Sequence, residues 1–175
     1  MISSKFGEVF WTSKLYYKIF RFFVYQFRLA ISAVWGDLNI VCPSVIFGEE
    51  LTRQLPMTSH VYAYRLMQVA PMGDLGFPTY KWMGVSHGQD IFYLFLPQLA
   101  KNIPAAHQLS HRMIEDWTTF AKVGHPQNAL WRESFHRETN DFNTRYIHLE
   151  VGHFRLVSGH FKETCEKIWK PIIFT

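Results

Sequence analysis

The amino-acid sequence predicts a fold of the α/β class, on three observations. The chain has 175 residues, a length that corresponds to one domain or a part of one. Hydrophobic residues make up 48% of the chain and aromatic residues 17%, which is ample for a packed core and argues against disorder. Segments with helical periodicity occur together with segments of strand-like alternation, and no internal repeat or low-complexity linker divides them.

Two helices and one strand are expected in the first part of the chain. In residues 14–34, apolar side chains recur every three or four positions, and basic side chains recur at the same spacing on another face. This pattern predicts a basic amphipathic helix. A second helix is expected over residues 44–55, ended by Pro56. Residues 60–69 alternate with aromatic and β-branched side chains, which predicts a strand.

The second part of the chain begins with a long loop, because Gly and Pro punctuate residues 70–88 throughout. The clearest helix is expected over residues 107–124, where Gly124 and then Pro126 end a regular apolar stripe. The other expected elements are a short helix over 89–99, strands over 144–151 and 153–158, and a helix over 160–172 that Pro171 breaks.

The net positive charge of the chain comes from its first thirty residues. They carry five Lys and Arg against Glu8 alone, a balance of +4, while the remainder has thirteen basic and thirteen acidic residues. No basic stripe interleaved with aromatic residues follows, so no nucleic-acid partner is expected. The helix over residues 14–34 has three interpretations: a surface helix of a larger body, contact with an anionic membrane surface, or a segment foreign to the domain. Because charges interrupt its apolar run, we do not expect a transmembrane span.

The two cysteines, Cys42 and Cys165, lie near opposite ends of the body of the chain. Their number permits a disulfide and an oxidising compartment, and it permits equally two unrelated buried thiols. The first fifteen residues contain no apolar core and no small-residue cleavage site, so we expect no cleavable signal there. The chain contains no Asn-x-Ser/Thr site for glycosylation.

The stretch "GVSHG", residues 84–88, allows two interpretations. As Gly-x-Ser-x-Gly it matches a nucleophile elbow, which would make Ser86 the attacking residue. An elbow needs a buried strand directly before the motif, whereas the preceding residues, "FPTYKWM", contain Pro and Lys. Its acid and its base would have to come from Asp116 or Asp141 and from His148 or His153. The other interpretation makes His87 the general base, and we favour it because of the surrounding motifs.

Six short motifs occur in a fixed order along the chain: "WGDLNIVCP", "VYAYRL", "WMGVSHGQDIFYLF", "LSHRMIEDWTTFAKVGHP", "RYIHLE" and "CEKIW". Together they resemble the C-terminal end of the type-B carboxylesterase family, which includes the cholinesterases. The resemblance covers residues 33–169, and residues 1–32 match less well. It implies the C-terminal portion of an α/β-hydrolase fold, namely the last sheet strands with their packed helices, over residues 33–175.

Within this resemblance, His87 matches the catalytic histidine of the family. A neutral imidazole can accept the proton of a serine and return it to the leaving alcohol. The nucleophilic serine and the acid of the family lie upstream, and no residue of this chain matches them. Asp37 and Asp90 match other positions. The resemblance therefore implies that the chain contains one member of a catalytic triad and is inactive alone.

The resemblance also bears on substrate, disulfide and location. Trp82, Met83 and Gln89 are candidate substrate-site residues, and Gln89 stands where cholinesterases have a Tyr, so a general carboxylic ester is the expected substrate. Cys42 and Cys165 match a disulfide of the family, which implies a secreted protein or one facing the cell exterior. The C-terminal helix is a candidate dimer contact.

The expected function of the parent protein is hydrolysis of a carboxylic ester. Two alternatives remain open: a catalytically dead adhesion or binding protein of the same family, and a small module that acts at membrane surfaces through residues 14–34. We expect no cofactor and no metal. His107 and His111 are interpreted as surface residues, because no Glu follows His107 as a zinc-protease motif requires.

Overall fold

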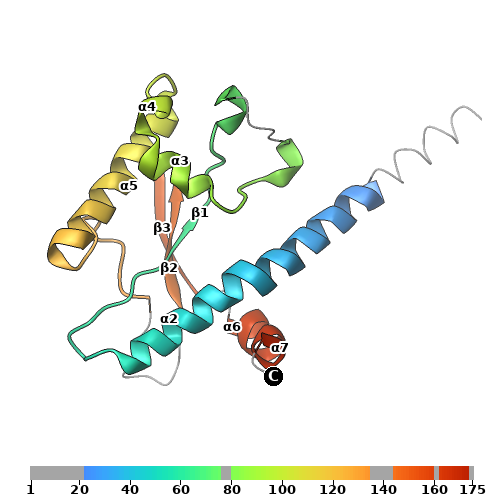
Figure 1. The fold of residues 1–175 in the computed structure, drawn as a ribbon, viewed down its shortest axis with the longest axis vertical. Coiled ribbons are helices and arrows are strands. Elements are labelled where there is room, and N and C mark those ends of the chain that lie inside the picture. The colour runs from blue at the N-terminus through green and yellow to red at the C-terminus, as the bar shows by residue number, and fades with distance from the viewer. Residues whose placement is uncertain (1–21, 76–79, 135–143, 160–161, 174–175) are drawn as a thin grey trace, which may run out of the picture. The chain divides into compact units, whose positions relative to one another are not determined.

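The computed structural model describes residues 22–75, 80–134, 144–159 and 162–173 (Figure 1). The chain forms two compact units, Met1–Val41 and Cys42–Thr175, and each is considered by itself. The first unit contains residues 1–32, the segment expected to match the family weakly, and extends to residue 41. The expected domain boundary between residues 32 and 33 stays a prediction.

The described part of the first unit is helical. Residues 22–36 form an α-helix and Asp37–Val41 form a π-helical turn, in which the Asn39 amide donates to the carbonyl oxygen of Trp35 at 2.9 Å. Large apolar side chains are exposed around this helix: Phe22, Phe23, Tyr25, Phe27, Leu29, Ile31, Val34, Trp35 and Ile40. At 100° per residue these positions are distributed over all faces of the helix, so the expected single apolar face is wrong for the described residues.

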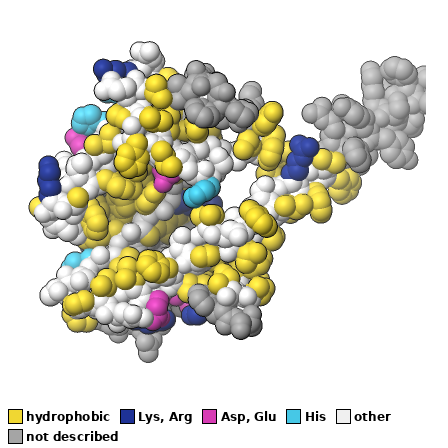
Figure 2. Space-filling view, viewed as in Figure 1, with side chains coloured by type: hydrophobic (Ala, Val, Ile, Leu, Met, Phe, Trp, Pro, Cys, Tyr) yellow, Lys and Arg dark blue, Asp and Glu magenta, His cyan; other side chains and the backbone are white. Residues whose placement is uncertain are grey.

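By length and composition alone, the helix Phe22–Gln54 qualifies as a membrane-crossing helix. The expectation that charges exclude a span is therefore not supported, because Lys14, Lys18 and Arg21 precede Phe22 and an 18-residue part of the helix carries at most two charged residues. Core helices of soluble proteins and signal sequences pass the same criteria. Figure 2 shows hydrophobic side chains along the length of this helix.

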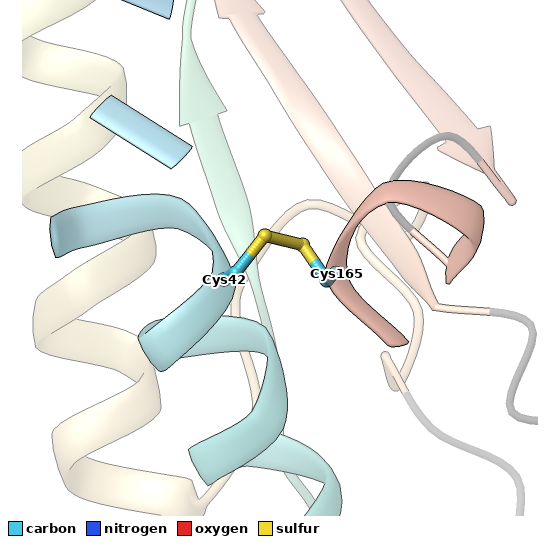
Figure 3. Close-up of a disulfide and its surroundings, with 2 residues drawn as sticks. All are labelled: Cys42 and Cys165. Carbon is cyan, nitrogen blue, oxygen red and sulfur yellow. A yellow bond between two sulfur atoms is a disulfide. The ribbon is translucent and has the colours of Figure 1, made fainter. Parts of the chain in front are cut away.

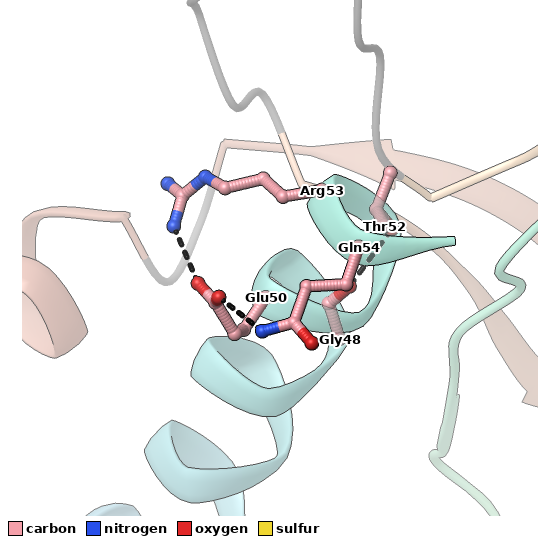
Figure 4. Close-up of polar contacts among 5 residues, drawn as sticks. All are labelled: Gly48, Glu50, Thr52, Arg53 and Gln54. Carbon is pink, nitrogen blue, oxygen red and sulfur yellow. Dashed lines mark hydrogen bonds and ion pairs between the residues drawn. The ribbon is translucent and has the colours of Figure 1, made fainter. Parts of the chain in front are cut away.

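The second unit begins with helix α2, Cys42–Gln54. Its last turn is closed by side-chain contacts: Glu50 accepts hydrogen bonds from Arg53 at 3.1 Å and from Gln54 at 2.6 Å, and the Thr52 hydroxyl donates to the Gly48 carbonyl (Figure 4). The helix ends before Pro56, as expected. α2 begins two residues earlier than expected and directly follows the π-helical turn Asp37–Val41, so Pro43 lies just after a wide turn of a continuing helix.

A three-stranded sheet in the order β1-β2-β3 forms the centre of the second unit. β1 (Tyr64–Leu66) pairs with β2 (Arg145–Glu150) in parallel, and β2 pairs with β3 (His153–Ser158) in antiparallel fashion across the turn at Gly152. β1 is much shorter than the expected strand over 60–69. On its N-terminal side a loop group takes the place of β2, because Ser134 N–H donates to the Val61 carbonyl; the Ala63 carbonyl accepts from Ile147 N–H of β2 as well as from the Trp131 indole N–H.

Three helices follow the loop. They are α3 (Gln89–Phe95), α4 (Pro97–Ala100) and α5 (Pro104–Val123), and Pro97 divides the single helix expected over 89–99. α5 starts three residues earlier than expected, with Pro104 in the favourable first position, and ends at Gly124 in the left-handed region as expected.

The main core joins these helices to the sheet. Phe92 and Tyr93 of α3, Leu109 and Met113 of α5, and Ile147 and Leu149 of β2 are all at most 1% exposed and form one cluster. Tyr146 and His148 alternate with the two core residues of β2, and their rings contact each other at 5.3 Å between centroids. Burying a side chain of this size contributes about 1.5–3 kcal/mol, so this cluster fixes α3, which starts directly after the loop of residues 84–88.

A second, smaller cluster holds the C-terminal segment. Cys42 and Cys165 form a disulfide with a Cα–Cα distance of 5.0 Å, which joins the start of α2 to a π-helical turn, Cys165–Trp169 (Figure 3). The expected disulfide is confirmed. Short helices α6 (Lys162–Thr164) and α7 (Lys170–Ile173) flank the turn. Pro171 lies inside α7, so it does not break the helix; a wide π turn immediately precedes it instead.

Candidate functional site

The candidate site is the loop Gly84–Gly88, called here the His loop because His87 lies in it. A short 3-10 helix, Lys81–Met83, leads into the loop, and α3 begins directly after it. Gly84 has φ +58° and Gly88 has φ +83°, and Gly88 is the N-cap of α3. Side chains disfavour these backbone angles, so glycine at both ends permits the sharp turn that presents His87.

His87 is exposed on this loop. Within the described part of the chain, no hydrogen bond or ion pair involves its imidazole ring. The ring is thus available to a group from outside the described residues, as an acid–base residue requires.

The surroundings of Ser86 do not form a nucleophile elbow. The segment before the motif is a 3-10 helix and not a strand, and α3 starts three residues after Ser86 instead of immediately. No described residue other than glycine has positive φ, whereas an elbow holds its serine on a strained turn. The Ser86 hydroxyl oxygen accepts a hydrogen bond from the Gln89 amide at 2.9 Å, so it contacts a neighbouring side chain and no histidine.

Gln89, a candidate substrate-site residue, is only 3% exposed. Its side-chain oxygen accepts from the backbone N–H of Ala70 at 2.9 Å, and its amide nitrogen donates to Ser86 and, at 3.3 Å, to the Gly84 carbonyl. The side chain therefore lies beneath the His loop and not on the exposed surface of this chain.

The other two candidate substrate-site residues, Trp82 and Met83, are exposed, by 37% and 39%. The Trp82 ring stacks on Tyr80 with 6.2 Å between ring centroids and 18° between ring planes. They lie just before the His loop in the chain, and the neighbouring Tyr80 is exposed as well. Their role in substrate binding stays a prediction.

One contact near the site was not anticipated from the sequence. The Tyr64 hydroxyl of β1 donates to Asp90 in the first turn of α3 at 2.7 Å. Burial and this hydrogen bond raise the pKa of Tyr64 well above its usual range, so the hydroxyl stays protonated and remains a donor. The Tyr64 ring packs edge-on against Trp117 at 4.8 Å and Trp131 at 6.0 Å. The alternating side chains of residues 60–69 predict that Tyr64 lies on a strand. No nearby sequence pattern indicates that Asp90 is its hydrogen-bond partner.

The acids and histidines considered for an elbow lie in other surroundings. Asp116 is fully buried in α5, where its carboxylate accepts from the Asn128 backbone N–H at 2.7 Å and holds the loop after the helix. His148 and His153 are on β2 and β3. Asp141 is outside the described residues. His107 and His111 are exposed on α5, and His111 contacts Glu115.

Metal-ligating side chains are not clustered in the described ranges: no group of three or more His, Cys, Asp or Glu there is placed to hold an ion. The described chemistry of the site is therefore that of a single exposed imidazole on an anchored loop.

Comparison with known proteins identifies the family. The profile of the carboxylesterase family matches residues 16–168, which includes the whole sheet and the His loop. The chain belongs to the carboxylesterase family, and its mixed helix-and-sheet structure is a part of the α/β-hydrolase fold. The match also includes residues 16–32, which we expected to match weakly.

Individual relatives are cholinesterases. The chain is 35% identical to an acetylcholinesterase of Bungarus fasciatus over 57% of this chain, and 31% identical to an acetylcholinesterase of Gallus gallus over 79%. It is 25% identical to a cholinesterase of Mus musculus over 82%. These alignments cover 16%, 17% and 23% of the three relatives, so the chain spans less than a quarter of the length of each.

Proposed function

We propose that this chain supplies the general base, His87, of a serine carboxylic ester hydrolase whose nucleophile and acid lie outside it. The observation that carries the proposal is the continuous family match over residues 16–168, which includes the His loop. The relatives contain several times the length of this chain, so there is ample sequence outside it to provide the other two groups.

In the proposed reaction, the imidazole of His87 accepts the serine proton as the serine oxygen attacks the ester carbonyl. The C–O bond to the alcohol then breaks, and His87 returns the proton to the leaving oxygen. Water repeats the sequence on the acyl-serine and releases the acid. The exposure of His87 supports this role, because the ring must reach a nucleophile and a substrate that other residues hold.

The substrate class we infer is a general carboxylic ester and not a choline ester. Two relatives are named acetylcholinesterases, but this chain has Gln89 at the position where a cholinesterase Tyr faces the cationic group. Gln89 is buried and has no aromatic face, so it provides no cation–π contact at this point.

The first test uses the chain alone, with a p-nitrophenyl ester and a fluorophosphonate probe. We expect neither turnover nor labelling, because loss of a triad nucleophile removes about 10⁶-fold of the rate. Stoichiometric labelling of Ser86 would revive the elbow interpretation.

The second test is a chimera in which residues 16–168 replace the aligned C-terminal part of the chicken acetylcholinesterase. Hydrolysis of p-nitrophenyl acetate should depend on His87, and His87→Ala should reduce kcat by roughly 10⁴-fold or more. His153→Ala, on an exposed strand position, is the matched control and should leave kcat unchanged. A folded chimera that binds ester without turnover in every variant would instead support a dead binding protein of the family.

The exposed apolar helix favours a second candidate function at membranes. The described part of residues 14–34 presents large apolar side chains on all faces, and Arg28 lies among them. Co-sedimentation with anionic vesicles tests this proposal; binding that persists in the isolated unit Cys42–Thr175 would place the lipid contact elsewhere.

We further propose that the parent protein is exported, because its disulfide needs an oxidising compartment to persist. Thiol titration of protein recovered from culture medium and from cytosol tests this: no free thiol is expected in the exported form. Dimerisation through the C-terminal helix is a separate proposal, and light scattering of the Ile168→Glu variant tests it, since Ile168 is 53% exposed.

A further inference from the structure

We propose that Gln89 is a positioning residue, whose side-chain amide ties the His loop to the end of the sheet and thereby fixes where His87 is presented. This inference rests on the proposed role of His87 as general base. It concerns a residue that is only 3% exposed.

The hydrogen bonds of Gln89 span two separate segments. Its oxygen accepts from the backbone N–H of Ala70, which lies nineteen residues earlier and four residues after β1. Because a backbone N–H can only donate, this contact fixes which side of the amide carries the oxygen. The nitrogen side then faces the His loop, where it donates to the Ser86 hydroxyl and the Gly84 carbonyl.

Both ends of this tether are anchored in the core. Ala70 is 2% exposed and belongs to the main hydrophobic cluster, and Gln89 is followed in α3 by Phe92 and Tyr93 of the same cluster. The Tyr93 hydroxyl adds a parallel contact to the Val69 carbonyl at 3.1 Å. The segment after β1 and the start of α3 thus form a rigid base under the loop.

The loop above this base needs such a tether. Gly84 and Gly88 bracket His87, and glycine permits more backbone conformations than any other residue. Apart from the side-chain bonds of Gln89, two long backbone contacts at the start of α3 involve the loop: Gln89 N–H donates to the Ser86 carbonyl at 3.3 Å, and Ile91 N–H donates to the Gly88 carbonyl at 3.2 Å. A general base must be held within hydrogen-bond reach of its proton donor, so loss of the tether should disperse the imidazole over positions that do not react.

The tether also explains the serine of the "GVSHG" motif. Ser86 accepts a hydrogen bond at the loop side of the tether, so its hydroxyl orients the loop and attacks nothing.

Three variants of the full chain separate the parts of the tether. Gln89→Leu removes all three side-chain bonds at similar volume. Gln89→Glu keeps the acceptor for Ala70, and its other carboxylate oxygen can accept from the Ser86 hydroxyl, but that oxygen faces the Gly84 carbonyl, which cannot donate, so the bond to Gly84 is lost. Gln54→Leu is the matched control, because Gln54 is an exposed glutamine that bonds only within α2 (Figure 4).

The measurements are amide hydrogen exchange at Ala70, NMR order parameters of the amides of residues 84–88, and the melting temperature. In Gln89→Leu we expect Ala70 exchange to accelerate about tenfold or more and loop order parameters to fall from about 0.85 to below about 0.6. In Gln89→Glu we expect Ala70 to remain protected while the loop loses order. Gln54→Leu should change neither value.

The proposal is overturned if the backbone at Gly84 keeps its order in Gln89→Glu, or if Gln89→Leu lowers only the melting temperature. Should Gln89→Leu fail to fold, Gln89→Glu decides alone. These measurements require no nucleophile and no turnover. They can therefore contradict the positioning role of Gln89 while the proposed ester hydrolysis still holds. In the active chimera, a positioning role predicts that Gln89→Glu lowers kcat with KM unchanged, whereas a substrate contact would raise KM.

Discussion

Breaking the Cys42–Cys165 disulfide should produce the largest stability change that a single bond of this chain can give. The bond joins residues 123 apart, and both cysteines are completely buried. They belong to a small cluster with Ile46, against which Trp169 and Ile173 pack. The disulfide is the covalent link between α2 and the C-terminal turn.

The magnitude follows from the length of the closed loop. In the chain-entropy model, a loop of this size restricts the unfolded ensemble by about 5 kcal/mol at 25 °C. For a chain of this length, 1 kcal/mol corresponds to about 2–4 °C in melting temperature, so reduction should lower Tm by roughly 10–20 °C. Amide hydrogen exchange of α2 and of the Cys165–Trp169 turn should also become faster on reduction, because α2 loses its covalent link to that turn.

The assay is urea unfolding in dilute solution, followed by tryptophan fluorescence, of oxidised protein and of protein reduced with a phosphine. Reduction is preferred to Cys→Ser variants, since two buried hydroxyls would add their own desolvation cost. The Cys42→Ala/Cys165→Ala variant is the control and should not respond to the reductant. A difference below about 1 kcal/mol between oxidised and reduced protein would refute the loop-entropy argument.

Three further predictions concern the surroundings of the site. Gly88→Ala should lower the free energy of unfolding in urea by about 1–2 kcal/mol. The added Cβ would meet only Ile91, at 3.9 Å, so the cost is backbone strain at positive φ. Gly88→Asn should therefore cost less, whereas equal losses in the two variants would point to a steric clash. Burial raises the pKa of Asp116, against the opposing hydrogen bond from Asn128. Protonated Asp116 thus stabilises the fold at low pH and the contribution is lost as pH rises through the folded pKa, so Asp116→Asn should flatten that part of the stability–pH curve. Tyr64→Phe should cost about 0.5–1.5 kcal/mol in thermal melts through loss of the bond to Asp90, while Tyr64→Ala should cost more because it also removes the ring packing.

Local periodicity predicted which elements form, and tertiary contacts determined where they end. The apolar stripe of residues 107–124 and the Gly124 stop predicted the end of α5 to within one residue, because both signals are local, whereas the helix starts three residues earlier, at Pro104. β1 is shorter than its alternating pattern, since Ser134 N–H of a loop bonds the Val61 carbonyl ahead of the ladder to β2. The disulfide was predicted from the family resemblance and not from spacing, because two cysteines 123 residues apart carry no local signal of their proximity.

The "GVSHG" motif shows why the site was only partly predictable. The sequence motif specifies residues at three positions, but an elbow is defined by a strand before the serine and a helix directly after it. Here a 3-10 helix precedes the motif, and two residues separate Ser86 from the start of α3. Local sequence could disfavour the strand, since Pro and Lys precede the motif. It could not reveal that Gln89 is buried, because a polar residue in the first turn of a helix normally faces water. Only the approach of Ala70, nineteen residues away, gives the amide a partner and turns it inward. The nitrogen of the same amide donates to the Ser86 hydroxyl, so Ser86 acts within the motif as a hydrogen-bond acceptor, and His87 is the exposed ionisable residue of the motif.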